Sequence, residues 1–332
     1  MLKLYKFMFL NILMMGTMIT VSSYSWFSMW MGLEINLLSV IPLFNSTKNT
    51  FPSESALKYF LSQSMASSIL LFAIICMIYS KEALINFSLI INSALLMKLG
   101  AAPFHFWFPE VMEGLNWFNS LLLLTWQKIA PMTLIFYSIK FNMFFFNIII
   151  FCAFIGSFIG LNQISLRKIL AYSSITHISW MLSSLILSSK IWIMYFSIYS
   201  IISIILIWML NKFNILYLYQ LTNFPHQNKM INYFFFMNLL SLGGLPPFLG
   251  FLPKMMVILL LTKENLYLLA ILMIFFVLIN LFFYIRLIIS SMMNLSKENI
   301  LFKSISFSFL IWMLTSFNLM GLLITPFIAL FL

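Results

Sequence analysis

Long apolar runs separated by short polar breaks make up almost the whole chain. Cutting the runs where charged residues, Asn and Pro cluster gives eleven segments, each long enough, at about 20 residues or more, to cross a bilayer as a helix. The segments are 4–22, 25–44, 56–79, 84–112, 117–138, 141–161, 166–188, 191–211, 229–262, 266–292 and 302–331. The longest connections are 45–55 and 212–228, which leave no room for a soluble domain. We therefore predict an all-α polytopic membrane protein with about eleven transmembrane helices in a single membrane domain.

The composition agrees with this pattern. Of the 332 residues, 63% are apolar and only 8% are charged, whereas a soluble protein is about a quarter charged. This excludes a two-domain soluble enzyme, because too little polar surface is available to cover one. The net charge of +11 does not indicate nucleic-acid binding, since the cations stand singly between apolar runs. The run 4–22 resembles a signal peptide, but it leads directly into another apolar run, so we predict a first membrane helix.

The distribution of lysine and arginine over alternate loops predicts the orientation in the membrane. With eleven spans, the side of the N-terminus collects ten cations: Lys3, Lys6, Lys48, Lys58, Arg167, Lys168, Lys212, Lys229, Lys297 and Lys303. The opposite side collects four: Lys81, Lys140, Lys190 and Lys263. Positive charge gathers on the cytoplasmic or organelle-matrix side, so we expect the N-terminus there and Leu332 on the other side.

Two segments are longer than one span and contain matching interruptions, "KLGAAPFHFWFPE" (98–110) and "LGGLPPFLGFLPK" (242–254). Both have glycine, then Pro-Phe, then a second proline six residues after the first: Gly100, Pro103 and Pro109, and Gly243–Gly244, Pro247 and Pro253. Proline removes a backbone donor and opens a helix. Open backbone at membrane depth is tolerated only inside protein or beside water.

A broken helix in each half of the chain is typical of transporters built from two repeats. We predict a first repeat at 4–138 with its broken helix at 84–112, and a second at 141–292 with its broken helix at 229–262. A final helix at 302–331 follows. The fourth segment starts on the less positive side and the ninth on the more positive side, which predicts inverted repeats. The alternative is two kinked helices that share a proline pattern by chance.

Four ionisable residues fall inside apolar segments: Glu34, Lys98, Lys128 and Lys254. On insertion scales a charge at a helix centre costs ~2.5–3.5 kcal/mol or more, so idle charges are rare there. Burial disfavours the charged form of such groups, and an acid with several lysines can then exchange protons. We interpret the four as a proton relay. The alternative is structural, since a buried Lys–Glu pair can lock two helices together and a lysine near a helix end can extend to the interface.

His177 is a fifth candidate for the relay. It lies mid-segment beside Ser173, Ser174 and Thr176, whose hydroxyls could hold water. His226 lies in a long connection, where we expect it to be solvated and without a role.

Cofactor chemistry is not expected in this chain. Cys76 and Cys152 lie inside apolar runs, and two cysteines are too few for an iron–sulfur cluster that needs four. Neither GxGxxG nor GxxxxGK[ST] occurs, and no histidines or carboxylates have metal-ligand spacing. We therefore predict no flavin, haem, iron–sulfur cluster or metal in contact with the chain.

Four motifs, namely "WMGLEINLLSVIPL", "LLMKLGAAPFHFWFPEVMEGLNWFNSLLLLTWQKIAP", "LRKILAYSSITHISWML" and "NLLSLGGLPPFLGFLPK", closely resemble the mitochondrially encoded antiporter-like subunits of respiratory complex I, in an insect form. The resemblance covers nearly the whole chain. It implies two inverted five-helix repeats, each with a broken helix. It also implies eleven spans, because animal members lack the first three of the fourteen spans in bacterial relatives.

The resemblance further implies a role for each candidate residue. Glu34 matches the glutamate at the start of the proton channel, and Lys98 matches its partner lysine on the first broken helix. Lys128 matches the connecting lysine, His177 lies in the connecting region of the second half, and Lys254 matches the lysine on the second broken helix.

The function implied is proton translocation by NADH:ubiquinone oxidoreductase, with the N-terminus in the mitochondrial matrix and the C-terminus facing the intermembrane space. NADH, FMN, iron–sulfur clusters and ubiquinone are then expected in other subunits. The expected partners are the other membrane-arm subunits, including neighbouring antiporter-like ones, and phospholipids such as cardiolipin, but no nucleic acid.

Two other classes stay open at this point, a free-standing cation/proton antiporter and a purely structural membrane anchor. If the relay exists, its members should lie at similar depth near the bilayer centre, with successive gaps within roughly 10 Å, because hydrogen bonds or one or two waters must link them. We expect Glu34 and Lys98 to form the closest acid–base pair.

Overall fold

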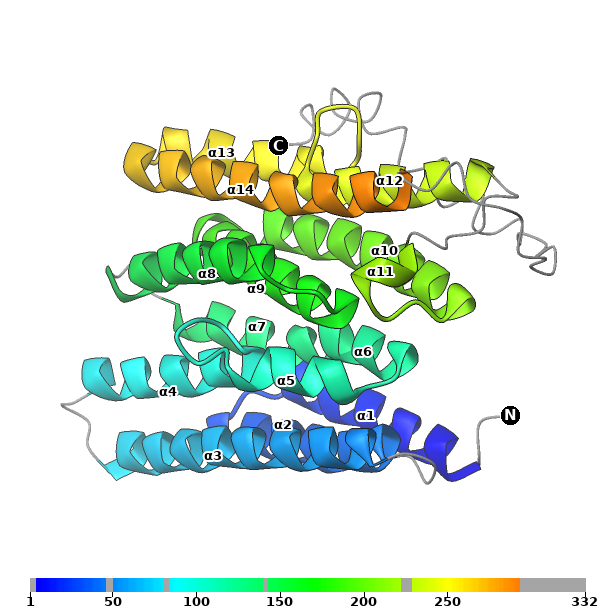
Figure 1. Cartoon of the computed structure of the whole chain (residues 1–332). Coiled ribbons are helices and arrows are strands. Elements are labelled where there is room, and N and C mark those ends of the chain that lie inside the picture. The colour runs from blue at the N-terminus through cyan, green and yellow to red at the C-terminus, as the bar shows by residue number, and fades with distance from the viewer. Residues whose placement is uncertain (1–3, 46–49, 80–83, 140–142, 222–228, 293–332) are drawn as a thin grey trace. The chain divides into compact units, whose positions relative to one another are not determined.

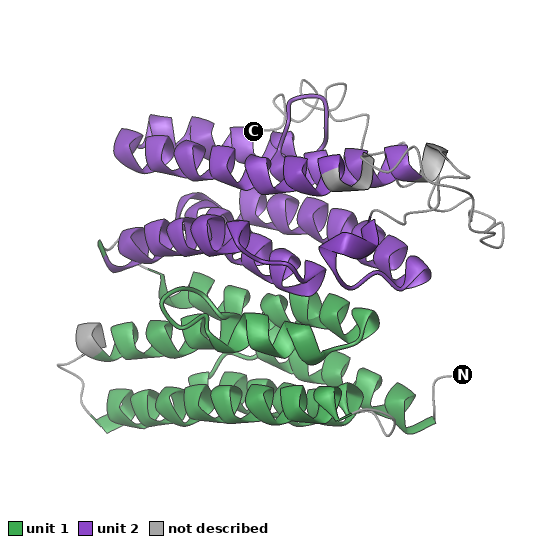
Figure 2. Cartoon of the chain, in the orientation of Figure 1, with its two compact units in different colours: residues 1–143 green, residues 144–332 purple. Residues whose placement is uncertain are grey.

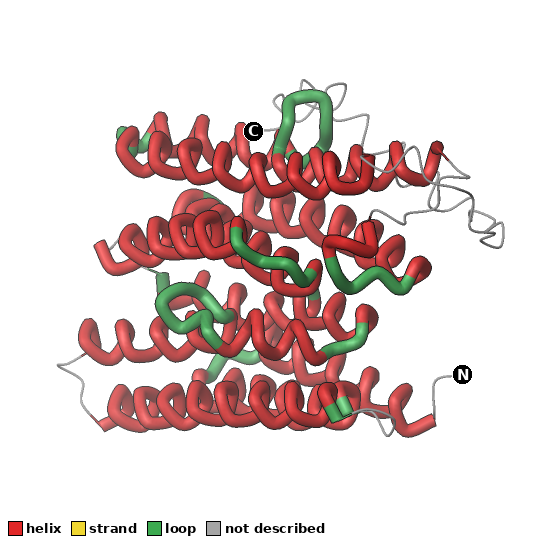
Figure 3. Tube along the Cα trace, in the orientation of Figure 1, coloured by secondary structure: helices red, strands yellow, loops and turns green. Residues whose placement is uncertain are grey.

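The computed structural model describes residues 4–45, 50–79, 84–139, 143–221 and 229–292. Within these ranges the chain consists of helices and their connections, and its only β-type pairing is an isolated bridge between Ser165 and Tyr217 (Figures 1 and 3). The predicted all-α class is confirmed for the described residues.

The chain divides into two compact units, Met1–Met143 and Phe144–Leu332 (Figure 2). The described helices of the first are α1 (Leu4–Ser22), α2 (Trp26–Phe44), α3 (Phe51–Tyr79), α4 (Leu84–Leu99), α5 (Trp107–Gly114), α6 (Trp117–Leu124) and α7 (Trp126–Ser138). Those of the second are α8 (Met143–Leu161), α9 (Leu166–Leu187), α10 (Ser189–Phe213), α11 (Leu218–Leu221), α12 (Lys229–Gly243), α13 (Phe251–Lys263) and α14 (Tyr267–Met292).

Seven of the described helices are long and apolar enough to cross a membrane, which supports a multi-pass membrane protein. They are α1, α2, α3, α8, α9, α10 and α14. The predicted segments 84–112, 117–138 and 229–262 each contain two shorter helices. The segment 302–331 lies outside the described residues, so the count of eleven spans stays a prediction.

Three details of the sequence prediction were wrong. The segment 117–138 is divided at Thr125, which has φ −113° and ψ −73°. Its N–H and its hydroxyl both donate to the Leu121 carbonyl, at 3.0 and 2.8 Å. The helix predicted from residue 56 begins at Phe51, and the connection 212–228 contains α11.

Packing within each unit brings the interrupted segments against long helices. In the first unit α3 contacts both α4 and α5, and α7 packs on α4. Gly114 of α5 lies so close to α3 that a β-carbon there would come within 2.8 Å of the Phe51 carbonyl oxygen. In the second unit α9 is buried along most of its length and contacts α10 and α13.

Candidate functional site

The first interruption begins where α4 ends at Gly100. Gly100 has φ +71°, a left-handed conformation that glycine adopts without steric cost. Its N–H donates to the Met97 carbonyl at 3.1 Å and the next N–H, of Ala101, donates to Leu96 at 3.0 Å, which is the hydrogen-bond pattern of a Schellman motif. The helix therefore ends at Leu99, one residue after Lys98, and glycine rather than proline ends it.

The remaining carbonyls of the last turn of α4 are bound by neutral side chains. Trp107 of α5 donates its indole N–H to the Met97 carbonyl at 3.0 Å, across the interruption. Gln63 of α3 donates its side-chain amide to the Lys98 carbonyl at 3.3 Å. The backbone of Lys98 is thus fixed by contacts from α3 and α5.

Lys98 and Lys128 border the same cavity. Their side chains are only 7% and 2% exposed, so neither reaches the surface of its unit. The cavity measures about 20 Å³, and Lys98 on α4 and Lys128 on α7 both line it. The Lys128 Nζ also lies 5.8 Å from the centre of the Phe108 ring of α5. A cavity needs about 10–15 Å³ to hold a water molecule, so this one has room for about one.

Glu34 does not form the predicted ion pair with Lys98. One carboxylate oxygen accepts a hydrogen bond from the Ser67 hydroxyl at 3.4 Å, and the other, Oε2, is buried without a partner among the described residues. The charge of Glu34 still acts on the Lys98 ammonium. Among the described residues the ion pair itself is absent, because Ser67 rather than a lysine binds the carboxylate. That Glu34 and Lys98 are the closest acid–base pair of the relay stays a prediction.

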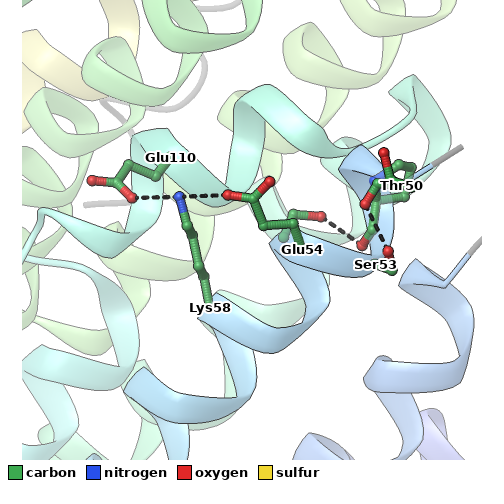
Figure 4. Close-up of polar contacts among 7 residues, drawn as sticks. Thr50, Ser53, Glu54, Lys58 and Glu110 are labelled. Atoms are coloured by element: carbon green, nitrogen blue, oxygen red, sulfur yellow. Dashed lines mark hydrogen bonds and ion pairs between the residues drawn. The ribbon is translucent and has the colours of Figure 1, made fainter.

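The ion pairs of the described chain centre on Lys58 instead. Its Nζ lies 3.2 Å from Glu54, one turn earlier in α3, and 3.0 Å from Glu110 of α5 (Figure 4). All three side chains are exposed, so these pairs contribute little stability, about 0–1 kcal/mol each. They show which ends of α3 and α5 lie together.

In the second unit His177 is paired with a tyrosine. Its Nδ1 lies 2.9 Å from the Tyr195 hydroxyl of α10, and its ring centre lies 4.9 Å from that of Tyr199. The serine and threonine hydroxyls next to it donate to backbone carbonyls three residues earlier in α9. These hydroxyls therefore donate within their own helix, and their binding of water stays a prediction.

A second cavity of about 10 Å³ connects His177 with the second interruption. It is lined by His177, Tyr195 and Tyr199 on one side and by residues of the interrupted segment, including Leu242 and Gly250, on the other. Its volume is at the lower limit for one water.

The side chain of Lys254 binds the end of α12 at the second interruption. Gly244 has φ +82°, and α12 ends in the same Schellman pattern as α4, with Gly244 donating to the Ser241 carbonyl at 3.0 Å and Leu245 to the Leu240 carbonyl at 3.3 Å. The Lys254 Nζ then donates to the carbonyls of Leu242 at 2.9 Å and Gly243 at 2.8 Å. A cation is favoured there by the negative end of the helix dipole.

The structure thus divides the five predicted residues into two groups. Glu34, Lys98 and Lys128 belong to the first unit, and His177 and Lys254 to the second. Among the described residues no cluster of three or more metal-binding side chains occurs, and the predicted absence of cofactors stays a prediction.

Sequence reasoning missed several neutral polar residues around the first cavity. Asn36 on α2, Tyr59 and Gln63 on α3, and Gln127 on α7 line it together with the two lysines. A polar residue at the apolar positions of a span was the available signal, but only charged residues and histidines were considered.

A family model described as NADH:quinone oxidoreductase/Mrp antiporter, TM matches residues 23–280. The chain therefore belongs to this family of membrane proteins, as its motifs predicted. It is 50% identical over 309 residues to NADH-ubiquinone oxidoreductase chain 2 of Anopheles gambiae, covering 91% of this chain and 90% of that relative.

Two solved structures share the fold. A chain of respiratory complex I from Thermus thermophilus has a TM-score of 0.86 and 20% identity, covering 98% of this chain and 80% of that one. A chain of the Mrp complex from Dietzia sp. has a TM-score of 0.76 and 17% identity, covering 85% of this chain and 59% of that one.

Proposed function

We propose that the chain is a proton-translocating membrane subunit of NADH:ubiquinone oxidoreductase, respiratory complex I, in the mitochondrial inner membrane. The observation that carries the proposal is the pair of buried lysines, Lys98 and Lys128, which border one cavity beside an interrupted helix. The family match and the identity to an insect complex I chain support the same function.

The energetics favour function over packing. Each lysine costs ~2.5–3.5 kcal/mol or more inside a membrane, and neither of these two can extend to the surface of its unit. The described residues offer the Lys98 ammonium neither an ion pair nor a hydrogen bond that would offset this cost. A purely structural anchor gains nothing from such a residue, whereas a proton carrier requires one that exists in charged and neutral forms.

The proposed relay contains Glu34, Lys98, Lys128, His177 and Lys254. The unpartnered oxygen of Glu34 is a place where the carboxyl can hold a proton. The His177–Tyr195 bond borders the second cavity, and Leu242, whose carbonyl binds Lys254, lines the same cavity.

The energy for transport must reach this chain through its neighbours. NADH, FMN, the iron–sulfur clusters and ubiquinone belong to other subunits in this proposal, and no redox step takes place in the chain. Its partners are the other membrane-arm subunits, including neighbouring antiporter-like ones, and phospholipids such as cardiolipin.

Each interrupted segment acts as one discontinuous span. In the first unit α3, with 29 residues, contacts both α4 and α5, and Lys58 near its start reaches Glu110 of α5. This arrangement fits a chain that enters the membrane with α4 beside the end of α3 and leaves it with α5 beside the start of α3. The repeats 4–138 and 141–292 are then inverted, with the N-terminus in the matrix and the C-terminus in the intermembrane space.

The test is Lys98→Met in the assembled complex. Methionine keeps the length and apolar stem of lysine but cannot carry a proton, so proton pumping and coupled NADH oxidation should fall at least about 100-fold, as expected for loss of a proton-transfer group. The measurement is the uptake of protons and the oxidation of NADH by inner-membrane vesicles. NADH oxidation by an artificial acceptor, which needs only the redox subunits, should be unchanged.

Lys58→Met is the matched control, because it removes an exposed lysine from the same unit. It should leave pumping unchanged. A fully assembled Lys98→Met complex that pumps normally would leave only the structural-anchor interpretation.

A cation/proton antiporter that acts alone is the second candidate, and the description of the matching family, which includes the Mrp antiporter, is compatible with it. Purification in mild detergent separates the two. Complex I subunits should co-purify with the chain in fixed proportion, whereas an isolated chain that exchanges sodium for protons in liposomes would support the antiporter.

A further inference from the structure

Gln127 links three helices at the cavity between the two lysines. It precedes Lys128 on α7 and lines the same cavity. Its Nε2 donates to the Asn36 side-chain oxygen of α2 at 3.0 Å, and its Oε1 accepts from the Tyr59 hydroxyl of α3 at 3.3 Å. Asn36 and Tyr59 are both 3% exposed, so this network is buried and fixes the orientation of the Gln127 amide.

The chemistry of the cavity requires acceptors as well as lysines. A lysine ammonium only donates hydrogen bonds, and a water between two lysines accepts from them through its lone pairs. Its own two protons then need acceptors, because a confined water makes about three hydrogen bonds. Glu34 does not line the cavity, whereas four residues with amide or hydroxyl oxygens do: Asn36, Tyr59, Gln63 and Gln127.

We propose that Gln127, held by Asn36 and Tyr59, is a positioning residue that orients one water for proton transfer between Lys98 and Lys128. The inference rests on the proposed proton-translocating function. In the step, charged Lys98 gives a proton to the water while the water gives one of its own to neutral Lys128. The water is regenerated, one N–H bond breaks at Lys98 and one forms at Lys128, and the reverse transfer follows the same path.

The competing interpretation is that Gln127 only holds α2, α3 and α7 together. Two substitutions separate the interpretations. Gln127→Leu keeps the size of the side chain and removes the amide. Gln127→Glu keeps its shape and introduces a titratable group beside the proposed water, which should change the pH dependence of the coupled rate. A group used only for packing would change yield or stability but not the shape of that profile.

The measurements are proton uptake, coupled NADH oxidation and their pH profiles in inner-membrane vesicles, with complex assembly followed on native gels. Gln127→Leu should lower pumping between about 10- and 100-fold, the effect of misplacing a reacting group by about 1 Å. Gln127→Glu should displace the pH profile. Tyr59→Phe removes one hydroxyl from the network and should give a smaller loss of pumping, and it replaces Gln127→Leu if that complex fails to assemble.

Asn119→Leu is the matched control. Asn119 is a buried amide of the same unit that donates to the Leu43 carbonyl at 3.0 Å and does not line the cavity. Its loss should leave the pumping and the pH profile unchanged. The inference is overturned if Gln127→Leu pumps like this control, or if Gln127→Glu keeps the wild-type pH profile while Tyr59→Phe keeps the wild-type rate.

Lys98→Met in the same preparation distinguishes the two proposals. If Lys98→Met stops pumping while the Gln127 variants pump normally, only the role of Gln127 is wrong. If Lys98→Met also pumps normally, the proton-translocating function fails and the role of Gln127 fails with it.

Discussion

Lysines at the two interruptions are held in different ways. At the end of α12 the Lys254 ammonium binds two backbone carbonyls, whereas at the end of α4 the neutral side chains of Gln63 and Trp107 bind the carbonyls of Lys98 and Met97. A charge-assisted hydrogen bond is roughly twice as strong as a neutral one, so protonation of Lys254 stabilises the end of α12. Lys98 has no such bond to lose when it gives up a proton. In the proposed relay the two lysines therefore suit different steps. Lys98 suits proton transfer, whereas protonation of Lys254 changes the stability of the end of α12.

Gly244→Ala should damage the site around Lys254. Its φ of +82° is disfavoured for alanine by about 1–2 kcal/mol. The added β-carbon would also lie 2.8 Å from the Cδ and Nζ of Lys254, forcing the ammonium away from its carbonyls. We expect a lower melting temperature of the assembled complex and reduced pumping.

Gly160→Ala is the control for this substitution, because a β-carbon at that position in α8 meets its nearest neighbour at 3.4 Å, an ordinary contact. It should change the stability by no more than about 0.5 kcal/mol and therefore leave the melting temperature nearly unchanged. Equal behaviour of the two variants would contradict the importance of the left-handed conformation at Gly244.

At the scale of helices, the interruption between α4 and α5 keeps both pieces on one long partner. Gly114 allows α5 to approach α3 closely, and the Lys58–Glu110 pair lies in the same region. The residues on either side of the interruption, Lys98 and Leu99 of α4 and Trp107 and Phe108 of α5, line the first cavity, so the break lies next to it.

Chemical crosslinking tests this path. In a chain with Lys58→Cys and Glu110→Cys, a short thiol-specific crosslinker should join the two residues, because their native side chains are in contact. The native Cys76 provides an internal control, since it lies 18 positions further along α3, about 27 Å from residue 58. Crosslinks from residue 110 to Cys76 in place of residue 58, seen by mass spectrometry, would contradict the proposed course of α5.

The helices and both interruptions could be predicted because they depend on local signals. Apolar runs of span length require no knowledge of neighbours, and the glycines at 100 and 244 end their helices through their own backbone conformation. The division at Thr125 could not be predicted, because a threonine hydroxyl competes with the backbone only in some contexts.

The site was less predictable for a related reason. Lys98 and Lys128 could be selected because a charge in an apolar segment is costly wherever it points, and the structure places both at one cavity. Gln127 carries no charge, and only the arrangement of α2, α3 and α7 shows that it faces Asn36 and Tyr59. The expected Glu34–Lys98 ion pair failed because the nearest partner of the carboxylate, Ser67, comes from a third helix.

At the scale of the whole chain, each unit contains an interrupted segment that begins with a left-handed glycine and borders a cavity. In each unit, moreover, two helix ends lie close together, and the loop charges assign both of these ends to the same side of the membrane. In the first unit these are the start of α3 and the end of α5, joined by Lys58. In the second, Arg286 near the end of α14 donates to the Gln163 carbonyl beyond the end of α8, at 3.1 Å. This agreement supports the alternation of sides within each unit.

The same alternation predicts opposite locations for the two termini. Ten loop cations on one side against four on the other place Lys3 and Lys6 in the matrix, and an odd number of spans places Leu332 in the intermembrane space. These residues lie outside the described ranges, so the measurement must be chemical.

Single cysteines introduced at residues 3 and 332, in a chain with Cys76→Ser and Cys152→Ser, should differ in labelling by a membrane-impermeant maleimide. Mitochondria with a ruptured outer membrane should label residue 332 only, and inverted inner-membrane vesicles should label residue 3 only. Labelling of both residues from the same side would exclude eleven spans, and with them the inverted repeats in which the fourth and ninth segments enter from opposite sides.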